Sequence, residues 1–143
     1  MCMKNGILFI AAMLVFVFSE DGYAQDLRNA SGSYWGTVET DGDVRNASGS
    51  YRGVFESDGD IRNASGTYVG VIETDGDIRN SSGSYMGVVE ADGDVRNSSG
   101  TYLGVIEDDG DVRNASGTYI GSAKGIDKRR AACLFFFFNM ETW

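Results

Sequence analysis

The segment Tyr68–Ser84, which reads YVGVIETDGDIRNSSGS, decides the fold, because its pattern returns along the chain with a period of 17 residues. The Arg-Asn pair keeps this step at six positions: Arg28, Arg45, Arg62, Arg79, Arg96 and Arg113. A fixed period of this length is the mark of a repeat architecture, in which each copy forms one supersecondary unit. The repeat therefore has to be interpreted before any local feature of the chain.

Each unit contains two strand-like segments and two turn signals. Thr67–Glu73 is rich in β-formers, Asp77–Asn80 is a shorter segment, and Asp-Gly and Ser-Gly mark the two junctions. A helix is excluded, because each unit carries several glycines and no apolar period of 3.6 residues. The unit predicts an all-β fold, an antiparallel meander of about six 17-residue hairpin repeats with about twelve strands.

The glycines predict the register of these hairpins. Thr74-Asp75-Gly76 fits a three-residue loop that ends in a left-handed glycine, and Ser82-Gly83 fits a two-residue loop. Because side chains alternate along a strand, an odd period requires one odd and one even loop if every unit is to present the same face. With these loops Ile72 faces Ile78, and Ile78 faces Gly87.

The two faces of the sheet follow from this register. We assign one face to the core because its positions barely change among the units: Tyr68, Gly70, Ile72 and Ile78. The position after the tyrosine varies and includes Arg52, which predicts solvent on that side. Its apolar members form a predicted outward interaction face: Trp35, Val69, Met86 and Leu103.

The C-terminal segment differs from the repeats. A basic linker begins at Lys124, and Ala131–Phe138 is then uninterruptedly apolar, with Phe135 and Phe136 as predicted core residues. We expect a short helix buried on all sides, and the alternative is a last buried strand. A ring of twelve strands leaves a hole about one helix wide, roughly 10 Å, so the helix is predicted to plug a shallow barrel.

The N-terminal segment predicts export. Lys4 precedes twelve apolar residues, Ile7–Phe18, and small residues surround a cleavage point after Ala24. A membrane helix is the alternative, but it needs about twenty apolar residues. The sequence thus divides into a signal peptide (1–24), the β-repeats (25–123) and the linker with the plug (124–143), and no transmembrane segment is expected in the mature chain. The protein is predicted in the periplasm, at the cell surface or secreted, and its only remaining cysteine, Cys133, precludes an intramolecular disulfide.

Composition excludes several functions. Acidic residues outnumber basic ones by 21 to 12, which gives a net charge of -9 and disfavours nucleic acid. The chain has no histidine, so imidazole catalysis and His-ligated zinc are excluded. Paired carboxylates suit a glycosidase, but near-identical copies do not create the special environment that catalysis requires. We expect no enzyme and no cofactor.

The acidic turns offer one alternative function. Glu73, Asp75 and Asp77 recur in every full unit, and clustered carboxylates are ligands for calcium. Asp-Gly is also ordinary turn chemistry, with Arg79 neutralising part of the charge. Asn80 and its equivalents head Asn-x-Ser motifs, which formally accept N-glycans, but the period explains them as residues that close a turn.

The repeats and the Phe-rich end resemble the bacterial short-repeat proteins of the beta-flower type. Their plan is similar to that of the C-terminal domain of Tubby-like proteins and of phospholipid scramblases, which implies a twelve-stranded barrel around a hydrophobic helix. The resemblance covers roughly residues 26–140. Tubby-like domains bind phosphoinositides through basic surface residues, and the acidic repeats here offer no matching site.

These observations predict an exported, non-enzymatic structural or binding module of the bacterial envelope or surface. Its partner is expected to be a protein, another envelope component or a second copy of the chain. The alternative is a calcium- or glycan-binding module that uses the repeated Glu/Asp-Gly-Asp turns.

Overall fold

The computed structural model describes residues 25–139, so the predicted signal peptide lies outside the described residues. Twelve short strands are followed by a helical plug, which consists of the α-helix α2 (Lys128–Ala132) and the π-helix η1 (Cys133–Phe137). The strands are β1 (Gln25–Asn29), β2 (Tyr34–Val38), β3 (Asp43–Asn46), β4 (Tyr51–Phe55), β5 (Asp60–Asn63), β6 (Tyr68–Ile72), β7 (Asp77–Asn80), β8 (Tyr85–Val89), β9 (Asp94–Asn97), β10 (Tyr102–Ile106), β11 (Asp111–Asn114) and β12 (Tyr119–Ser122).

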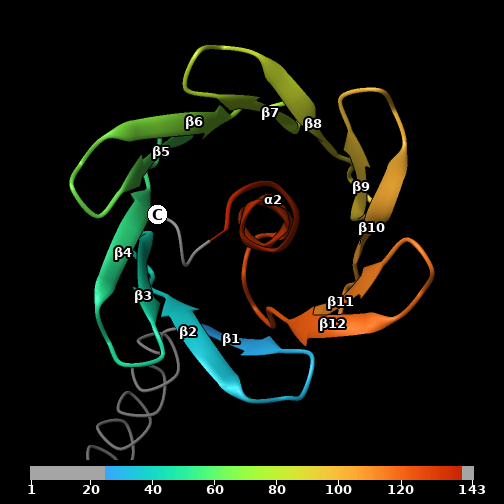
Figure 1. The fold of residues 1–143 in the computed structure, drawn as a ribbon, viewed down its shortest axis with the longest axis horizontal. Helices are drawn as coiled ribbons and strands as arrows, with labels where there is room; N and C mark the ends of the chain where they lie inside the picture. Colours follow the sequence, from blue (N-terminus) through green and yellow to red (C-terminus); the bar gives the residue numbers. More distant parts are fainter. Residues whose placement is uncertain (1–24, 140–143) are drawn as a thin grey trace, which may run out of the picture.

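The strands form a closed antiparallel barrel in which sequence neighbours pair and β1 closes onto β12 (Figure 1). The closing pairs are Arg28 with Ser122 and Asn29 with Gly121. The plug lies in the middle of this ring. The predicted all-β meander of hairpin repeats, closed into a barrel around a C-terminal helix, is therefore confirmed, and the last-strand alternative is wrong.

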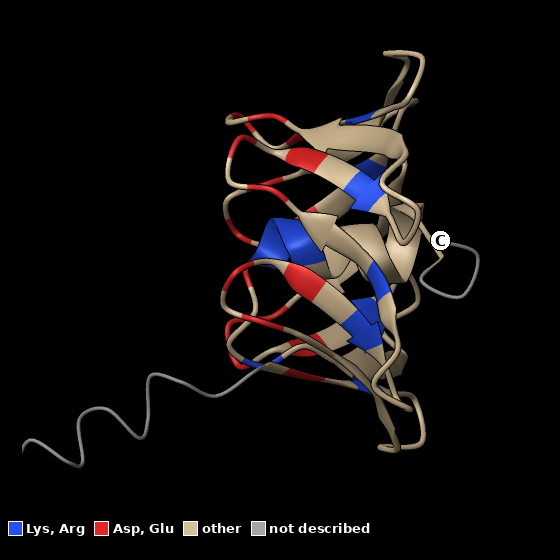
Figure 2. Ribbon diagram, turned by 90° about the vertical axis from the view of Figure 1, so that its left-hand side faces the viewer, with Lys and Arg blue, Asp and Glu red and all other residues tan. Residues whose placement is uncertain are grey.

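The barrel has two different ends. Six hairpins, here called petals, are closed at the petal end by tips such as Ser81–Gly83. The turns between petals, such as Thr74–Gly76, lie at the opposite, acidic end, where the carboxylates gather (Figure 2). The petal tips spread outward, and the acidic turns form a narrower ring around the start of α2.

Both kinds of turn contain three residues. At the acidic end the N–H of Glu73 donates to Asp77 O (2.8 Å), and Gly76 has φ +97°. At the petal tip the N–H of Asn80 donates to Ser84 O (3.0 Å), and Gly83 has φ +84°. Glycine adopts this left-handed conformation without steric cost. The predicted three-residue acidic loop is confirmed, and the predicted two-residue Ser82-Gly83 loop is wrong.

A β-bulge reconciles two odd loops with an odd repeat. Ile72 faces Ile78, as predicted, and Ile78 faces Gly87. Arg79 faces Tyr85, however, so Met86 is the extra residue of the bulged strand. A bulge puts two residues opposite one and thereby restores the alternation that the even loop was expected to restore. The same irregularity occurs in the other petals.

The bulge reverses part of the predicted face assignment. Trp35, Val69, Met86 and Leu103 are half-buried and pack against the core, so the prediction that they form an outward face is wrong. Tyr68 was predicted in the core, but its ring lies beside the outer guanidinium of Arg62. Gly70 is buried, Ile78 is fully buried, and Ile72 packs against the core, as predicted.

The core lies between the wall and the plug. The short strands each contribute one fully buried residue: Leu27, Val44, Ile61, Ile78, Val95 and Val112. The plug contributes Ala131, Ala132, Cys133 and Leu134, all at most 2% exposed. Small residues in α2 let the helix fit the narrow space, and the wall closes around it. Within residues 25–139, no helix has both the length and the hydropathy that crossing a membrane requires.

Candidate functional site

From β3 on, the arginine near the end of each short strand contacts both ends of the barrel on the outside. Arg79 Nε lies 3.3 Å from Glu73 Oε1 at the acidic end, and Arg79 Nη1 donates to Gly83 O (3.2 Å) at the petal tip. Its guanidinium carbon lies 5.7 Å from the centre of the Tyr85 ring, within the range of a cation–π contact. The same stacking recurs in the pairs Arg45–Tyr51, Arg62–Tyr68, Arg96–Tyr102 and Arg113–Tyr119.

The asparagine of each petal is used to close the tip. Asn80 Oδ1 accepts hydrogen bonds from the N–H of Ser82 (3.0 Å), the hydroxyl of Ser82 (2.8 Å) and the N–H of Ser84 (3.0 Å). Asparagine commonly closes turns in this way. The sequence-based interpretation of Asn and Ser as turn-closing residues is thus confirmed, and the Asn80 oxygen is fully used within its own tip.

The acidic turns bring the predicted calcium candidates together. Glu73, Asp75 and Asp77 place one carboxylate oxygen each within 4.8 Å of one another, as do four equivalent groups among the described residues. Much of this capacity is already used, because Glu73 pairs with Arg79 and Asp75 Oδ1 accepts the N–H of Asp77 (3.0 Å). Calcium takes six to eight oxygen ligands, so each group would have to recruit water or give up its arginine.

One carboxylate of these turns, Asp43, has a pKa shifted by burial and by neighbouring charge. Burial raises the pKa of Asp43, and the negative charge of Asp41 raises it further, while Arg45 opposes both effects. The attraction of Arg45 is thus too weak to cancel burial together with the negative charges of Asp41 and Glu39.

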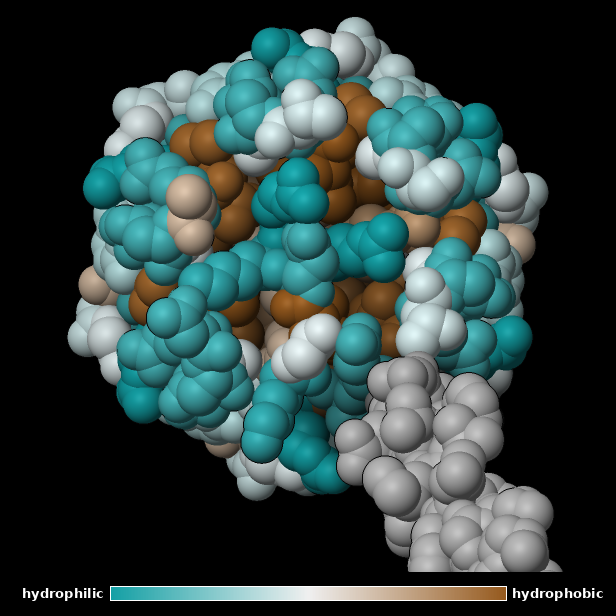
Figure 3. All heavy atoms as spheres, turned by 180° about the vertical axis from the view of Figure 1, so that it is seen from behind, coloured by the Kyte–Doolittle hydropathy of each residue, from teal (hydrophilic) through white to brown (hydrophobic). Residues whose placement is uncertain are grey.

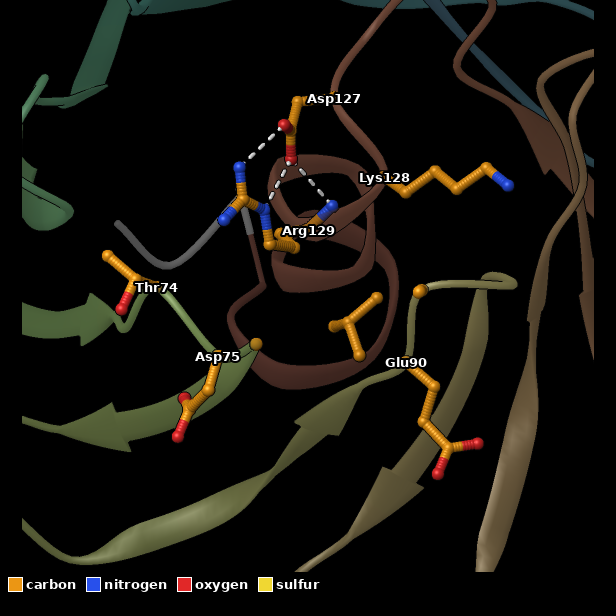
Figure 4. A pocket seen from close by; sticks show the side chains of 9 residues that line it. Thr74, Asp75, Glu90, Asp127, Lys128 and Arg129 are labelled. Atoms are coloured by element: carbon orange, nitrogen blue, oxygen red, sulfur yellow. Dashed lines mark hydrogen bonds and ion pairs between the residues drawn. The ribbon is translucent and has the colours of Figure 1, made fainter.

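The start of the plug brings positive charge into the middle of this acidic ring. Asp127 caps α2 by accepting the N–H of Arg129 (2.8 Å) and pairs with Arg129 Nη2 at 3.0 Å (Figure 4). Lys128 forms an ion pair with Asp108, which belongs to the turn between β10 and β11. Burial raises the pKa of Asp127, but hydrogen bonds from the Arg129 side chain and backbone outweigh it and hold that pKa below its usual value.

Two open hollows flank the capped helix start at the acidic end. One is lined by Thr74, Asp75, Glu90, Lys128 and Arg129. The other lies between Glu56, Asp58 and Arg130, with Phe55 at its side. In Figure 3 the central polar cluster stands inside the ring of turns, and apolar side chains are visible in the gaps. Both hollows mix acidic groups of the wall with basic groups of the plug.

The petal end carries an aromatic cluster. Phe135, Phe136, Phe137 and Phe138 contact four successive petals, because a Cβ added at Gly121, Gly104, Gly87 or Gly70 would lie 2.5–2.8 Å from the respective ring. The rings of Trp35 and Phe135 are 5.1 Å apart. Trp35, Leu134–Phe138 and Asn139 line a concave surface, here called the aromatic mouth. Phe135 and Phe136 pack against the core as predicted.

A comparison with known protein families agrees with this architecture. A family model described as "5-fold beta-flower protein" matches residues 24–139. The chain belongs to this beta-flower family. No curated protein and no solved structure gives a significant match. The similarity to Tubby-like domains and scramblases stays a prediction.

The family description is five-fold, whereas the described residues of this chain form six petals. Five acidic groups occupy the turns between these petals. At the place of a sixth turn the chain passes through Ala123–Ile126, where Ile126 N–H donates to Ala123 O (3.1 Å), and then enters the plug. The N–H of Ala123 also donates to Gly110 O (2.8 Å), the bond that Val89 makes to Gly76. The last repeat is thus converted into the connection to the helix.

Sequence reasoning anticipated that Arg79 neutralises part of the acidic turn but missed its stacking on Tyr85, although a signal for this stacking is present. A tyrosine follows the arginine by six residues throughout the repeats, and a glycine follows that tyrosine by two. The glycine permits a bulged strand, and the constant spacing brings the tyrosine beside the arginine. These signals could have indicated that the tyrosine, and not the residue after it, lies outside.

Proposed function

We propose that this beta-flower protein is an exported, non-enzymatic structural and binding module of the bacterial cell envelope or surface. The observation that carries the proposal is the use of its repeated polar groups within the fold. Arg79 connects the two turns that flank its strand, and Asn80 closes its own tip. Catalysis needs one special environment with shifted acids and bases, whereas these groups repeat in near-identical surroundings.

The outer wall at the petal end is the surface best suited to a partner. Tyr34, Tyr51 and Tyr85 are 36–41% exposed and stand around the outside of the barrel. Tyrosine offers a large apolar ring together with a polar hydroxyl group, a combination that is frequent in interfaces. Because the positions repeat around a ring, several weak contacts can act together on a partner with repeated features.

Export and binding require separate tests. Expression of the full chain in a bacterial host, followed by cell fractionation and mass spectrometry, should give an envelope or secreted protein that starts at Gln25. A cytoplasmic, uncleaved product would contradict the export part. A photo-crosslinking residue at Tyr85 should give a defined adduct in intact envelopes, and the same residue at Thr74, in an acidic turn, serves as the matched control. Adducts at Thr74 alone would indicate that the partner binds at the acidic end instead.

The calcium-binding alternative rests on the five convergent carboxylate groups. Calorimetric titration distinguishes it, because a calcium module should bind saturably with a stoichiometry tied to these groups. Asp75→Asn should then remove one site and leave the others. Absence of saturable heat with the intact protein would eliminate this alternative and leave the binding-module proposal unaffected.

A further inference from the structure

The acidic end of the barrel departs from its repetition beside Ile72, at the end of β6. Ile72 is half-buried, whereas its five equivalents are at most 3% exposed: Val38, Phe55, Val89, Ile106 and Ala123. Gly59, in the turn between β4 and β5, is also half-buried, while its four equivalents are buried: Gly42, Gly76, Gly93 and Gly110. The wall is therefore more open between β4 and β6 than elsewhere at this end.

The position of the plug accounts for this opening. The helix α2 makes its main contacts with β8 and β10, which leaves the side of β4 and β6 less covered. The result is a hollow of about 400 Å³ between the wall and the plug, a volume within the range of small-molecule sites. Figure 3 shows apolar side chains in the gaps between the plug and the ring of turns. Ile72 is one apolar part of the lining of this hollow.

Arg130 brings an unpaired positive charge to the hollow. The two basic residues before it, Lys128 and Arg129, have carboxylate partners, but within residues 25–139 no carboxylate pairs with Arg130. Its guanidinium carbon lies 5.7 Å from the centre of the Phe55 ring. This stacking holds the planar group by its face and leaves its N–H donors, which lie in the plane, for an acceptor.

Asp58 supplies the opposite charge in the same lining. Its Oδ1 accepts the N–H of Asp60 (3.0 Å), and no basic side chain of the described residues forms an ion pair with it. Glu56 also lines the hollow, but it pairs with Arg62 at 3.2 Å. The hollow thus has one unpaired carboxylate from the wall, one unpaired guanidinium from the plug and an apolar part at Ile72.

We propose that this hollow binds a small zwitterion with an apolar side chain, the chemistry shared by free aliphatic amino acids and short peptides. The ligand carboxylate accepts hydrogen bonds from Arg130, the ligand ammonium group pairs with Asp58, and the apolar side chain packs against Ile72. The surrounding carboxylates disfavour a plain anion, and Arg130 disfavours a plain cation. This site lies at the acidic end, separate from the tyrosines of the outer wall, so either proposal can fail without the other.

Titration of the isotope-labelled full chain with leucine, followed through its backbone amide resonances, tests the proposal. At neutral pH and low salt we expect saturable shifts at Gly59, Ile72 and Arg130, with a Kd of about 1 mM because the hollow is open. Isoamylamine lacks the carboxylate of leucine and isocaproate lacks its ammonium group, so each should bind at least about tenfold more weakly. Tighter binding of alanyl-leucine than of leucine would identify a peptide as the ligand, and weaker binding a free amino acid.

Two pairs of variants assign the charges. Arg130→Gln should weaken leucine binding at least about tenfold, whereas Lys124→Gln removes an exposed basic residue outside the hollow and should change nothing. Asp58→Asn keeps the oxygen that accepts the turn hydrogen bond, and it should weaken binding about threefold because water screens an exposed charge. Asp92→Asn, at the same position of the turn between β8 and β9, is the matched control.

Several results would overturn the proposal. One is the absence of saturable shifts with both leucine and alanyl-leucine. Equal binding of isoamylamine would show a plain cation site, and equal binding of isocaproate a plain anion site. Unchanged binding in Arg130→Gln would contradict the role of the guanidinium.

A further variant keeps the test decisive if Arg130→Gln does not fold. Ser57→Trp fills the hollow from an exposed turn residue and should abolish binding. Ala91→Trp, at the equivalent position between β8 and β9, should leave binding unchanged. Leucine that still binds to the Ser57→Trp protein would show that this hollow is not the site.

Discussion

The wall and the plug fill the barrel with different kinds of contact, repeated in the wall and unique in the plug. The wall is built from near-identical units, each of which pairs with its two neighbours. The plug occurs once, has no counterpart in the repeats, and contacts several petals through successive residues. Contacts in a repeat array contribute nearly equal local terms to stability, whereas each plug contact is unique. The comparison predicts that damage to the plug affects the whole barrel and damage to one petal stays local.

The two regions also differ in how they use charge. In the wall, Arg79 and its equivalents pair with carboxylates of their own neighbourhood. In the plug, Lys128 reaches a carboxylate on the wall, Asp108. The wall charges thus shape each unit, and the plug charge links the helix to the acidic ring.

Removal of the plug should have the largest effect. Truncation after Ile126 exposes the buried side chains that line the interior, such as Ile78 and Val95, and leaves the ring without a centre. We expect loss of cooperative thermal unfolding and aggregation of the product. A finer version is Leu134→Asp, which buries an unpaired charge at a residue that is 2% exposed. A truncated protein that stays soluble and melts near the parent temperature would show that the wall is stable alone.

A methyl group at the contact between wall and plug should have the next largest effect. In Gly70→Ala the added Cβ would lie 2.5 Å from Arg79 O and 2.8 Å from Phe138 Cζ, which forces either the strand or the plug to move. We expect a loss of about 3 kcal/mol in the free energy of unfolding, measured by urea denaturation.

Gly83→Ala, at a petal tip, is the matched control for this change. Nothing lies within 4 Å of its added Cβ, so only the left-handed backbone conformation is penalised, by about 1 kcal/mol. Gly70 does not have this backbone conformation, so a loss at Gly70 no larger than the one at Gly83 would mean that the close contacts with Arg79 O and Phe138 are relieved at little cost.

Removal of one wall arginine should lower the free energy of unfolding by less than these changes, and by the same amount in different petals. Arg79→Ala removes an ion pair with Glu73, a hydrogen bond to Gly83 O and the stacking on Tyr85. Its side chain is 36% exposed, so water screens much of the charge, and we expect a loss of about 1–2 kcal/mol. Arg62→Ala, in the preceding unit, should give the same value within about 0.5 kcal/mol. A large difference between the two variants would show that the units are not energetically equivalent.

The smallest effect is expected at the helix cap and depends on pH. Asparagine caps helices as well as aspartate does, so Asp127→Asn removes the charge next to Arg129 and keeps the cap. Because the folded-state pKa of Asp127 is lowered, its charge stabilises the protein above the unfolded-state pKa of about 3.9, and this contribution disappears as the pH falls through the folded-state pKa.

The cap variant should therefore be less stable than the parent by about 0.5 kcal/mol at pH 7, a value reduced by solvent screening, and the gap should close at an acidic pH below the folded-state pKa of Asp127. Urea denaturation midpoints at both pH values give this comparison. A gap that widens in acid would contradict the lowered pKa.

The sequence by itself determined the architecture of this protein. The period of 17 residues, the two glycine turns and one apolar segment of helix length were enough for twelve strands around a helix. The acidic turn was also predicted correctly, including the pairing of Ile72 with Ile78. These features depend on local preferences and chain length, which the sequence states directly.

Tertiary structure decided which side chains face the plug. An odd repeat with a three-residue acidic loop required either an even loop at the petal tip or a bulge in the strand. Local sequence preferences did not distinguish these two solutions. The bulge lets Arg79 stack on Tyr85 outside, and it turns Met86 toward the core. It also sets Gly87 against Phe137. The contact of Gly87 with Phe137 joins segments far apart in the sequence, and for this reason the faces became clear only once the barrel was closed around its plug.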